Sequence, residues 1–332
     1  MHPILCSPRF PANKPMAAKR VLVTGATGFI GRWAVASLLA RGYEVHVATS
    51  RAVSGANGLP AEIADAWLHE ANLLLPGICV ALVDEVRPSH LLHFAWNVVP
   101  GVYWTTPDNF RWVAASIQLL QAFERVGGHR AVMAGSCAEY DWARASVCHE
   151  ETTPLAVDGS ALATPYATCK VALQKMLAAY GRQARISTAW GRIFFHYGPH
   201  EHRDRLVSSV ICNLLAGQDA ACTHGRQIRN FIHVADVGDA FAALMESDVQ
   251  GPVNIGSDQR FSLAEMLTLI GDEVGRADLL KLGARPAPLN EPAVLVPDVG
   301  RLYGEVGWRP RFTLEAGLSE TIDWWRRQPT IV

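Results

Sequence analysis

Three residues have types and spacings suited to proton transfer at an oxygen atom: Ser136, Tyr166 and Lys170. Tyr166 and Lys170 are four positions apart, so on a helix their phenol and ammonium groups lie on one face. The ammonium favours the phenolate, and we expect it to lower the pKa of Tyr166 toward a useful acid–base value. The Ser136 hydroxyl could hold a substrate oxygen beside Tyr166.

A helix and a strand must position these residues. Residues 165–180 form an expected helix, with Thr164 as its N-cap and Pro165 at its first position. Residues 130–134 form an expected strand, and Ser136 follows its carboxyl end. Doubly wound sheets have their sites at that end of the strands. We therefore expect Ser136 to lie at the site.

A glycine-rich turn lies between a Val-rich strand, Arg20–Thr24, and an expected helix over residues 29–41. Such a turn lets the backbone approach a pyrophosphate, and the helix N-terminus attracts the phosphates. The turn therefore predicts a dinucleotide site. The expected contacts are Gly25, Thr27, Gly28, Phe29, Ile30 and Gly31.

The residues after the second expected strand, Glu44–Thr49, indicate which dinucleotide binds. Sites for NAD usually have Asp or Glu there to bind the ribose hydroxyls, whereas this chain has Ser50 and Arg51. Both side chains could bind a 2′-phosphate, Arg51 through charge-assisted hydrogen bonds. We expect NADP(H) to be preferred. NAD(H) is the alternative, with Arg51 as a solvated loop residue.

Strands and helices alternate along the first two thirds of the chain. Further strands are expected at residues 89–95, 130–134 and 185–195, and further helices at 109–126 and 165–180. This alternation predicts an α/β fold, a Rossmann-type doubly wound parallel sheet. After residue 196 the pattern loosens, which predicts a smaller C-terminal α+β part that binds the substrate.

The expected domain boundaries follow from this pattern. Residues 17–195 with 231–250 are assigned to the dinucleotide-binding core, and residues 196–230 with 251–332 to the substrate-binding part. Residues 1–16 are expected to be a disordered extension, and Met16 is an alternative natural start to Met1.

Composition excludes several classes of partner. The 332 residues include 30 basic and 31 acidic ones, so the net charge of −1 favours neither nucleic acid nor an anionic membrane as a partner. No stretch has the length and apolarity of a transmembrane helix. The seven scattered cysteines are typical of reduced thiols in a cytoplasmic protein.

The glycine turn, Ser136, Tyr166 and Lys170 together resemble the extended short-chain dehydrogenase/reductase family, in its NAD-dependent epimerase/dehydratase group. Four later segments extend the resemblance toward the last helix: residues 192–199 (RIFFHYGP), 229–237 (RNFIHVADV), 254–257 (NIGS) and 307–310 (GWRP). The resemblance implies a nucleotide-sugar substrate. It also implies a homodimer formed by two helices, which we expect to include residues 109–126 and 165–180.

The resemblance also implies specific contacts. On the cofactor side, the implied residues are Asn72 and Leu73 near the adenine, and Phe94, Ala95 and Trp96 near the nicotinamide. On the substrate side, they are Cys137, Ala138, His196, Arg205, Arg229 and Arg285. Arg229 would contact the diphosphate, which suits a guanidinium. We expect His196, His200 and His202 to contact the sugar rather than a metal ion.

Two departures from the family pattern narrow the reaction. Dehydratases of the group have an Asp-Glu pair after the catalytic hydroxyl, where this chain has Cys137 and Ala138, with Glu139 one place further on. Epimerases of the group usually hold NAD through an acidic residue after the second strand, which is also missing. We therefore expect an NADPH-dependent reductase of a nucleotide-linked 4-keto-6-deoxy sugar, with Tyr166 as proton donor.

Two alternatives remain open. One is a nucleotide-sugar 4-epimerase with tightly bound NAD. The other, from a different class, is a non-catalytic protein that senses dinucleotides on the same fold, although a sensor would not need Ser136, Tyr166 and Lys170 together.

Overall fold

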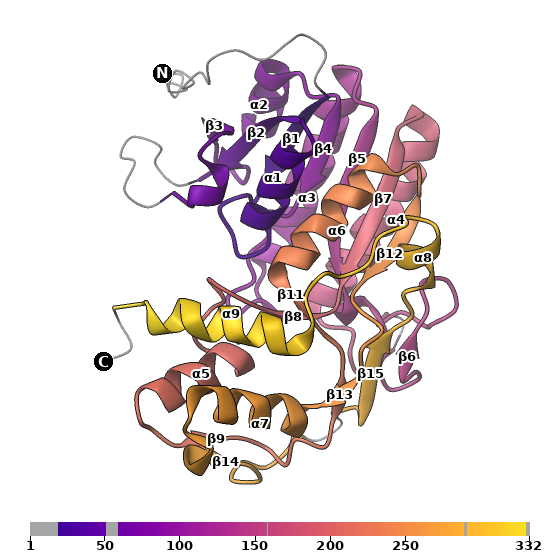
Figure 1. Cartoon of the computed structure of the whole chain (residues 1–332). Helices are drawn as coiled ribbons and strands as arrows, with labels where there is room; N and C mark the ends of the chain where they lie inside the picture. Colours follow the sequence, from indigo (N-terminus) through magenta and orange to yellow (C-terminus); the bar gives the residue numbers. More distant parts are fainter. Residues whose placement is uncertain (1–18, 51–58, 158, 289–290, 330–332) are drawn as a thin grey trace.

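A seven-stranded parallel sheet forms the centre of the described chain (Figure 1). The computed structural model describes residues 19–50, 59–157, 159–288 and 291–329. The strand order is β12-β7-β5-β4-β1-β2-β3. The strands are β1 (Arg20–Thr24), β2 (Glu44–Thr49), β3 (Trp67–Glu70), β4 (His90–His93), β5 (Arg130–Ser136), β7 (Ser187–Ile193) and β12 (Gly251–Ile255). Because the order reverses between β1 and β4, a crevice is expected at their carboxyl ends.

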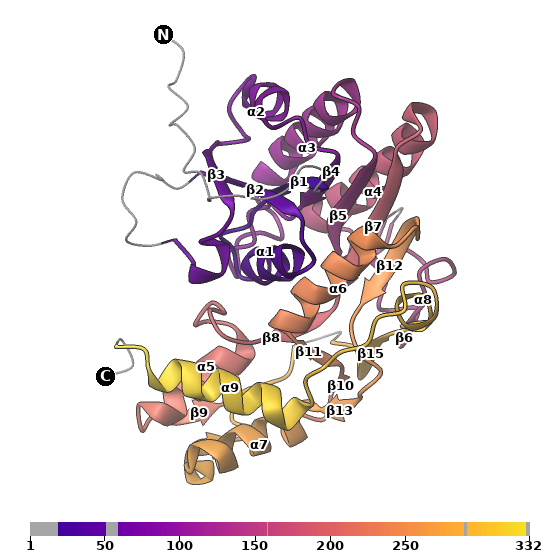
Figure 2. The ribbon, with the colours of Figure 1, turned by 45° about the horizontal axis from the view of Figure 1, so that its top comes forward.

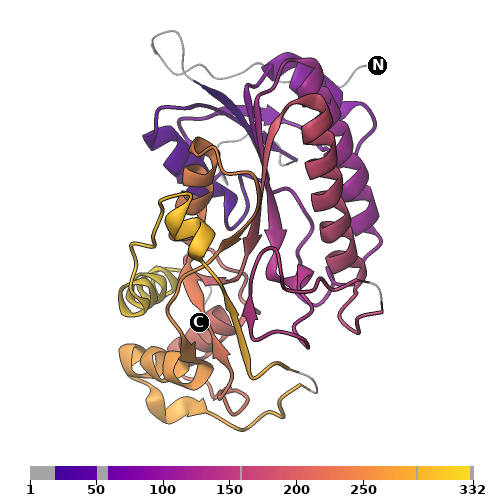
Figure 3. The ribbon, with the colours of Figure 1, turned by 90° about the vertical axis from the view of Figure 1, so that its right-hand side faces the viewer.

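Helices cover both faces of the sheet, as the edge-on view in Figure 3 shows. One layer contains α1 (Gly31–Ala40) and α6 (Val234–Glu246), and the other contains α2 (Ile78–Val86), α3 (Asp108–Arg125) and α4 (Pro165–Ala184). The central strands are apolar on both sides for this reason. In β1, for example, Val21, Leu22 and Val23 are fully buried. The predicted doubly wound fold is confirmed.

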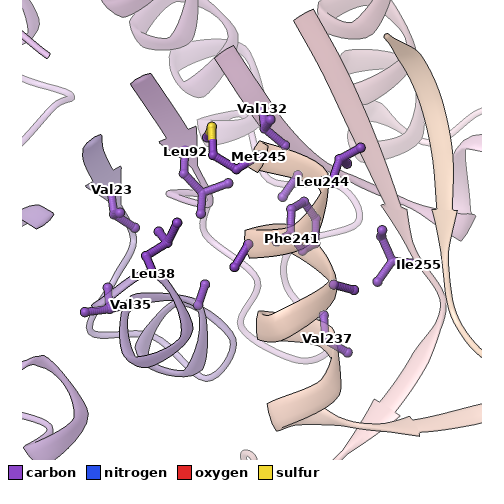
Figure 4. Close-up of a cluster of buried hydrophobic side chains, with 14 of the residues drawn as sticks. Val23, Val35, Leu38, Leu92, Val132, Val237, Phe241, Leu244, Met245 and Ile255 are labelled. Atoms are coloured by element: carbon purple, nitrogen blue, oxygen red, sulfur yellow. The ribbon is translucent and has the colours of Figure 1, made fainter. Parts of the chain in front are cut away.

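The return of the chain at α6 completes one of the two core layers. Figure 4 shows Phe241 of α6 among Val23, Leu92 and Val132 of the sheet and Leu38 of α1. All five side chains are fully buried. The chain thus returns to the core at α6, Val234–Glu246.

The C-terminal segments form a smaller α+β part beneath the carboxyl ends of the strands (Figure 2). Its main helices are α5 (Leu206–Leu215), α7 (Leu263–Val274) and α9 (Leu314–Arg326), which share a third apolar cluster. Its short strands are β6 (Val147–Cys148), β8 (Phe195–Tyr197), β9 (Ala220–Ala221), β10 (Ile228–Arg229), β11 (Phe231–His233), β13 (Phe261–Ser262), β14 (Leu280–Lys281) and β15 (Val294–Pro297). The remaining short helices of the described chain are η1 (Ala61–Ile63), η2 (Cys137–Glu139), η3 (Ala277–Leu279) and α8 (Gly300–Gly304).

The structure corrects three details of the sequence-based expectation. First, β12 was assigned to the substrate-binding part, but it pairs with β7 at the edge of the central sheet, where Val253 and Ile255 are fully buried. Second, β3 and α2 were not predicted. Third, the strand expected over residues 185–195 ends at Ile193, and β8 pairs with β11 instead. The rest of the domain assignment stays a prediction.

Two further expectations concern the environment of the chain. None of the helices within the described residues is long and apolar enough to cross a membrane. The cysteines of the described chain are free and buried: Cys79, Cys137, Cys148, Cys169, Cys212 and Cys222. Cys6 and residues 1–16 lie outside the described residues.

Candidate active site

A cavity of about 1090 Å³ lies at the carboxyl ends of β1, β2, β4 and β5 and extends to α5 and β10. Small-molecule sites usually have about 300–1,000 Å³, so this cavity is large for one ligand. The residues that line it come from the switch point of the sheet, between β1 and β4, and from the C-terminal part. The fold therefore supplies one space in which a dinucleotide and a second molecule could meet.

The glycine turn forms the wall of this cavity between β1 and α1. Gly25 has a φ of +70°, and a Cβ there would lie 2.7 Å from the backbone nitrogen of Ala95. A Cβ on Gly31 would collide with the carbonyl of Gly25. Both positions therefore require glycine, and all six residues predicted from the turn line the cavity. The N-terminus of α1 suits a pyrophosphate.

A buried hydrogen-bonded chain holds the end of β4 against this turn. His93 Nδ1 lies 2.6 Å from Thr24 Oγ1, and His93 Nε2 lies 2.8 Å from Ser116 Oγ on α3. The amide of Ala95 also donates to Thr24 Oγ1, at 3.3 Å. Burial lowers the pKa of His93 to about 3, so the ring is neutral. This hydrogen-bonded chain fixes the segment with Phe94, Ala95 and Trp96, all of which line the cavity.

Ser136, Tyr166 and Lys170 all line the same cavity. Ser136 ends β5, and its hydroxyl accepts the Ala138 amide at 3.2 Å. The other two residues lie in α4, where the Thr164 side chain accepts the Ala167 amide at 3.2 Å as the predicted N-cap. Lys170 Nζ donates to the Ala134 carbonyl at 2.8 Å and lies 3.8 Å from the centre of the Trp96 ring.

The protonation of the pair differs from the sequence-based expectation. Burial raises the pKa of Tyr166, against a smaller lowering contribution from its hydrogen bond with Ser136. Burial also lowers the pKa of Lys170 to about 7. The expectation that the pKa of Tyr166 is lowered is therefore wrong for the protein's own groups, because they raise it. Desolvation is the stronger effect for a phenol that is 6% exposed.

The remaining cofactor contacts lie along the adenosine side. Ser50, Asn72 and Leu73 line the cavity, as does Thr49 at the end of β2. Arg51 lies outside the described residues. The glycine turn, which has no room for a Cβ at Gly25 and Gly31, and the buried Lys170 fit a nicotinamide dinucleotide, which when bound supplies or accepts a hydride.

Arg229 lines the substrate side of the cavity on β10 and has a partner that the sequence did not indicate. Its guanidinium lies 3.1 Å from a carboxylate oxygen of Glu291, and the other oxygen accepts a hydrogen bond from Gln227 at 2.7 Å. Glu291 itself lines the cavity. No local motif marked Glu291, because the pair joins segments 62 residues apart.

The other predicted substrate residues separate into two groups. Cys137, Ala138, His196 and Arg205 line the cavity. Arg285 is exposed and is not among the described residues that line it. His196 stacks on Phe29 with the ring centres 5.5 Å apart, and burial lowers its pKa to about 4. Among the described residues, no cluster of three His, Cys, Asp or Glu could hold a metal ion.

Glu139 does not reach the reacting end of the cavity. It is fully buried, and its carboxylate lies 2.8 Å from Arg192 Nε on β7. The same carboxylate accepts the Ser136 amide at 2.8 Å and the indole N–H of Trp190 at 2.9 Å. Glu139 therefore holds the end of β5 in place, and Cys137 and Ala138 are the residues that follow Ser136 along the cavity wall.

Comparison with known proteins agrees with this geometry. The sequence model of the NAD dependent epimerase/dehydratase family matches residues 21–256. The chain belongs to this family. The matched segment runs from β1 to the end of β12, so it contains the glycine turn, Ser136, Tyr166 and Lys170.

Relatives of this family member have several named activities. UDP-glucuronic acid decarboxylase 1 of Xenopus tropicalis is 27% identical over 93% of this chain and 73% of its own length. UDP-glucose 4-epimerase of Corynebacterium glutamicum is 25% identical over 89% of this chain and 92% of its own length.

Solved structures of other proteins have a similar fold. UDP-glucose 4-epimerase of Thermus thermophilus, solved in complex with NAD, is 25% identical with a TM-score of 0.78 and covers 93% of this chain and 99% of its own. The Thermotoga maritima UDP-glucose 4-epimerase, at 20% identity, has a TM-score of 0.81 over 93% of this chain and 99% of its own, which shows the fold.

Proposed function

We propose that this family member is an NADPH-dependent reductase of a nucleotide-linked 4-keto-6-deoxy sugar. The observation that carries the proposal is the pair Cys137 and Ala138 beside Ser136, with Glu139 bound to Arg192 beneath the site. Elimination of water needs a second acid–base group beside the catalytic hydroxyl. Reduction of a ketone needs one proton donor, which Tyr166 can supply.

The other carboxylates that line the cavity are already engaged. Asp108 pairs with Arg111 at 3.0 Å, and Glu201 accepts the Ser208 hydroxyl at 2.7 Å. Glu291 holds Arg229. Each of the three carboxylates is thus held by a side chain of the protein.

The mechanism follows from the protonation of the site. Ser136 hydrogen-bonds the ketone oxygen and orients the carbonyl against Tyr166. Tyr166 is protonated because burial raises its pKa, so it is poised to give its proton to the forming alkoxide. Lys170 is fixed by the Ala134 carbonyl and would hold the ribose hydroxyls of the cofactor. The bound cofactor supplies the hydride.

The positive groups indicate where the nucleotide lies. Arg205 and Arg229 both line the cavity, and Arg229 lies close enough to Cys137 to affect the pKa of its thiol. A diphosphate held by Arg229 would place the sugar on the Ser136 side of the cavity. Guanidinium groups suit such a diphosphate. The preference for NADPH is supported by Ser50 and the absence of an acidic residue at positions 49–51.

The deciding experiment follows absorbance of the reduced nicotinamide. Purified protein is mixed with NADPH or NADH and with 4-keto-6-deoxy sugars linked to dTDP, CDP, GDP or UDP. We expect substrate-dependent loss of absorbance, at least ~10-fold faster with NADPH at limiting concentration. Tyr166→Phe should lower kcat by at least ~100-fold and keep the Kd for NADPH within about threefold. Near-normal turnover by this variant would overturn the role of Tyr166.

The second candidate is a nucleotide-sugar 4-epimerase, which the similarity to the Corynebacterium glutamicum enzyme favours. Such an enzyme would purify with NAD and interconvert UDP-glucose and UDP-galactose without added reductant. Interconversion together with a flat absorbance trace would replace the reductase proposal with this one. Dinucleotide binding without either activity would favour the sensor.

A further inference from the structure

One side of the cavity beside Tyr166 is formed by aromatic and small apolar side chains. We call it the aromatic wall, and it consists of Trp96, Tyr103, Trp104, Cys137, Ala138 and Trp142, all of which line the cavity. The proposed mechanism uses none of these side chains. Their chemistry determines which groups on the substrate can be accommodated next to the reacting carbonyl.

Ring contacts place the wall directly at Tyr166. The centre of the Tyr166 ring lies 4.8 Å from that of Tyr103, 5.8 Å from that of Trp104 and 6.4 Å from that of Trp96. Each pair is close to perpendicular. The Tyr166 amide also donates to the Trp104 carbonyl at 3.2 Å, which ties the loop before α3 to the start of α4.

The small residues of the wall lie at the catalytic hydroxyl itself. The Cys137 thiol contacts the Ser136 hydroxyl, and Ala138 donates its amide to the same oxygen. Burial raises the pKa of Cys137 to about 12, so the thiol is neutral and a weak hydrogen-bond donor. A substrate oxygen held by Ser136 thus has apolar atoms beside it.

Two of the N–H groups of the wall are already hydrogen-bonded within the protein. The indole N–H of Trp96 donates to Asn109 Oδ1 at 2.8 Å, and that of Trp142 donates to the Cys137 carbonyl at 2.7 Å. The Tyr103 hydroxyl stays protonated, because burial raises its pKa to about 12. Tyr103 and Trp104 can each offer one polar atom, which suits few of the hydroxyls of a hexose.

The apolar surface continues outward from the wall. Val98 and Val99 line the cavity, yet 45% and 49% of their surfaces are exposed. They lie on the same loop as Tyr103 and Trp104. The lining beside Tyr166 is thus mainly aromatic and aliphatic, with Asn97 as a polar side chain on the same loop.

We propose that the sugar of the substrate lacks hydroxyl groups on both sides of its carbonyl region, as in a nucleotide-linked 4-keto-3,6-dideoxyhexose. The inference rests on the proposed reductase function and names its substrate class. A hydroxyl at C3 would lose its hydrogen bonds to water and find few polar partners on the wall. A methylene at C3 loses no hydrogen bonds, and its burial is favourable. We expect the dideoxy substrate to be preferred by about 10- to 100-fold in kcat/KM.

The reaction balances as a two-electron reduction. A C–H bond forms at C4 when the carbonyl carbon receives a hydride from NADPH, and the carbonyl π bond breaks toward oxygen. The oxygen takes the proton of Tyr166, which recovers a proton from solvent, and NADP⁺ leaves. Neither C3 nor C6 changes, so the deoxygenated carbons affect recognition only.

The test compares 4-keto-6-deoxy and 4-keto-3,6-dideoxy hexoses on the same nucleotide. Steady-state NADPH oxidation gives kcat/KM for each, and calorimetry with the protein–NADP⁺ complex gives their affinities. A preference of about 10-fold or more for the dideoxy sugar supports the inference. Equal values, or preference for the hydroxylated sugar, overturn it and leave the reductase standing. If neither is reduced, the proposed function fails, and the affinity ratio alone still tests the wall.

A conservative variant tests the wall directly. Cys137→Ser replaces a weak hydrogen-bonding group with a strong one at nearly unchanged volume. It should reduce the preference for the dideoxy sugar by at least about fivefold, through better binding of the hydroxylated one. Cys222→Ser, at a buried thiol that does not line the cavity, is the matched control and should keep the wild-type ratio. An unchanged ratio in Cys137→Ser would exclude the wall as the source of selectivity.

Discussion

At the scale of single residues, burial controls the charges of this site. Tyr166 and Lys170 are 6% and 4% exposed, and desolvation moves each toward its neutral form. A neutral phenol is the form that a proton donor requires. The Lys170 pKa of about 7 means that small changes in its surroundings can alter its charge near neutral pH.

Glu201 is a second buried group with a shifted pKa, and it affects stability. Burial raises its pKa to about 7, against the hydrogen bond from Ser208. Because the pKa of Glu201 is raised in the folded state, its protonation stabilises the fold. This stabilisation is fully present below about pH 4.5 and is lost as the pH rises through about 7. Glu201→Gln should therefore gain roughly 2–3 kcal/mol relative to wild type between about pH 5 and about pH 8.

Urea unfolding at both pH values measures this gain for Glu201→Gln. Glu151→Gln, at an exposed position, is the matched control and should change little between the two pH values. A constant difference between Glu201→Gln and wild type across the range would show that Glu201 does not titrate there.

At the scale of elements, the start of α4 sets the position of the acid–base pair. Thr164 has an extended backbone and its side chain accepts the Ala167 amide, while Pro165 fills the first helical position without a free N–H. The helix then directs Tyr166 and Lys170 to one side, against β5. Capping and catalysis thus involve neighbouring residues.

Thr164→Ala should lower the free energy of unfolding by about 1 kcal/mol, because it removes this cap. We also expect a lower kcat with little change in KM, since Tyr166 lies two residues away. Thermal unfolding and steady-state kinetics measure the two effects. Thr168→Ala, at an exposed position inside α4, is the matched control and should be neutral or slightly stabilising. Equal behaviour of the two variants would contradict the role of the cap.

At the scale of the whole molecule, the C-terminal part is tied to the core through α6. The fully buried Asp236 accepts the backbone N–H groups of Arg311 and Phe312 at 3.0 and 2.9 Å. These residues lead into α9, which packs with α5 and α7 around the substrate side (Figure 1). The predicted homodimer stays a prediction, although exposed Phe110 on α3 and Met176 on α4 would suit such an interface.

Asp236→Ala should lower the free energy of unfolding by roughly 2–4 kcal/mol, because two backbone amides lose their acceptor, which is the fully buried Asp236 carboxylate. Substrate affinity should fall as well, since α5 and β10 carry cavity residues of this part. Differential scanning calorimetry and substrate titration measure these effects. Asp65→Ala, at an exposed site, should leave both unchanged within about 0.5 kcal/mol. Wild-type stability of Asp236→Ala would show that the docking of α9 does not depend on this contact.

The sequence by itself determined the central strands of the sheet and the glycine turn, because these depend on local signals. It also identified Ser136, Tyr166 and Lys170, which line one cavity. Val-rich runs, glycine spacing and a Tyr and Lys four residues apart are visible within short windows. The resemblance to the family indicated that Cys137 and Ala138 stand where dehydratases of the group have an acidic pair. The exposed Arg285 shows its limit, because a charged residue in a loop carries no local mark of where it will lie.

Only the tertiary structure decided which distant residues share the site and what their charges are. Glu291 meets Arg229 across 62 residues, and Arg192 holds Glu139 away from the cavity across 53. The aromatic wall joins the loop before α3 to the end of β5. The pKa of Tyr166 likewise depends on how completely the surrounding chain excludes water. Burial and long-range pairing arise from packing of the whole chain, so no local sequence pattern specifies them.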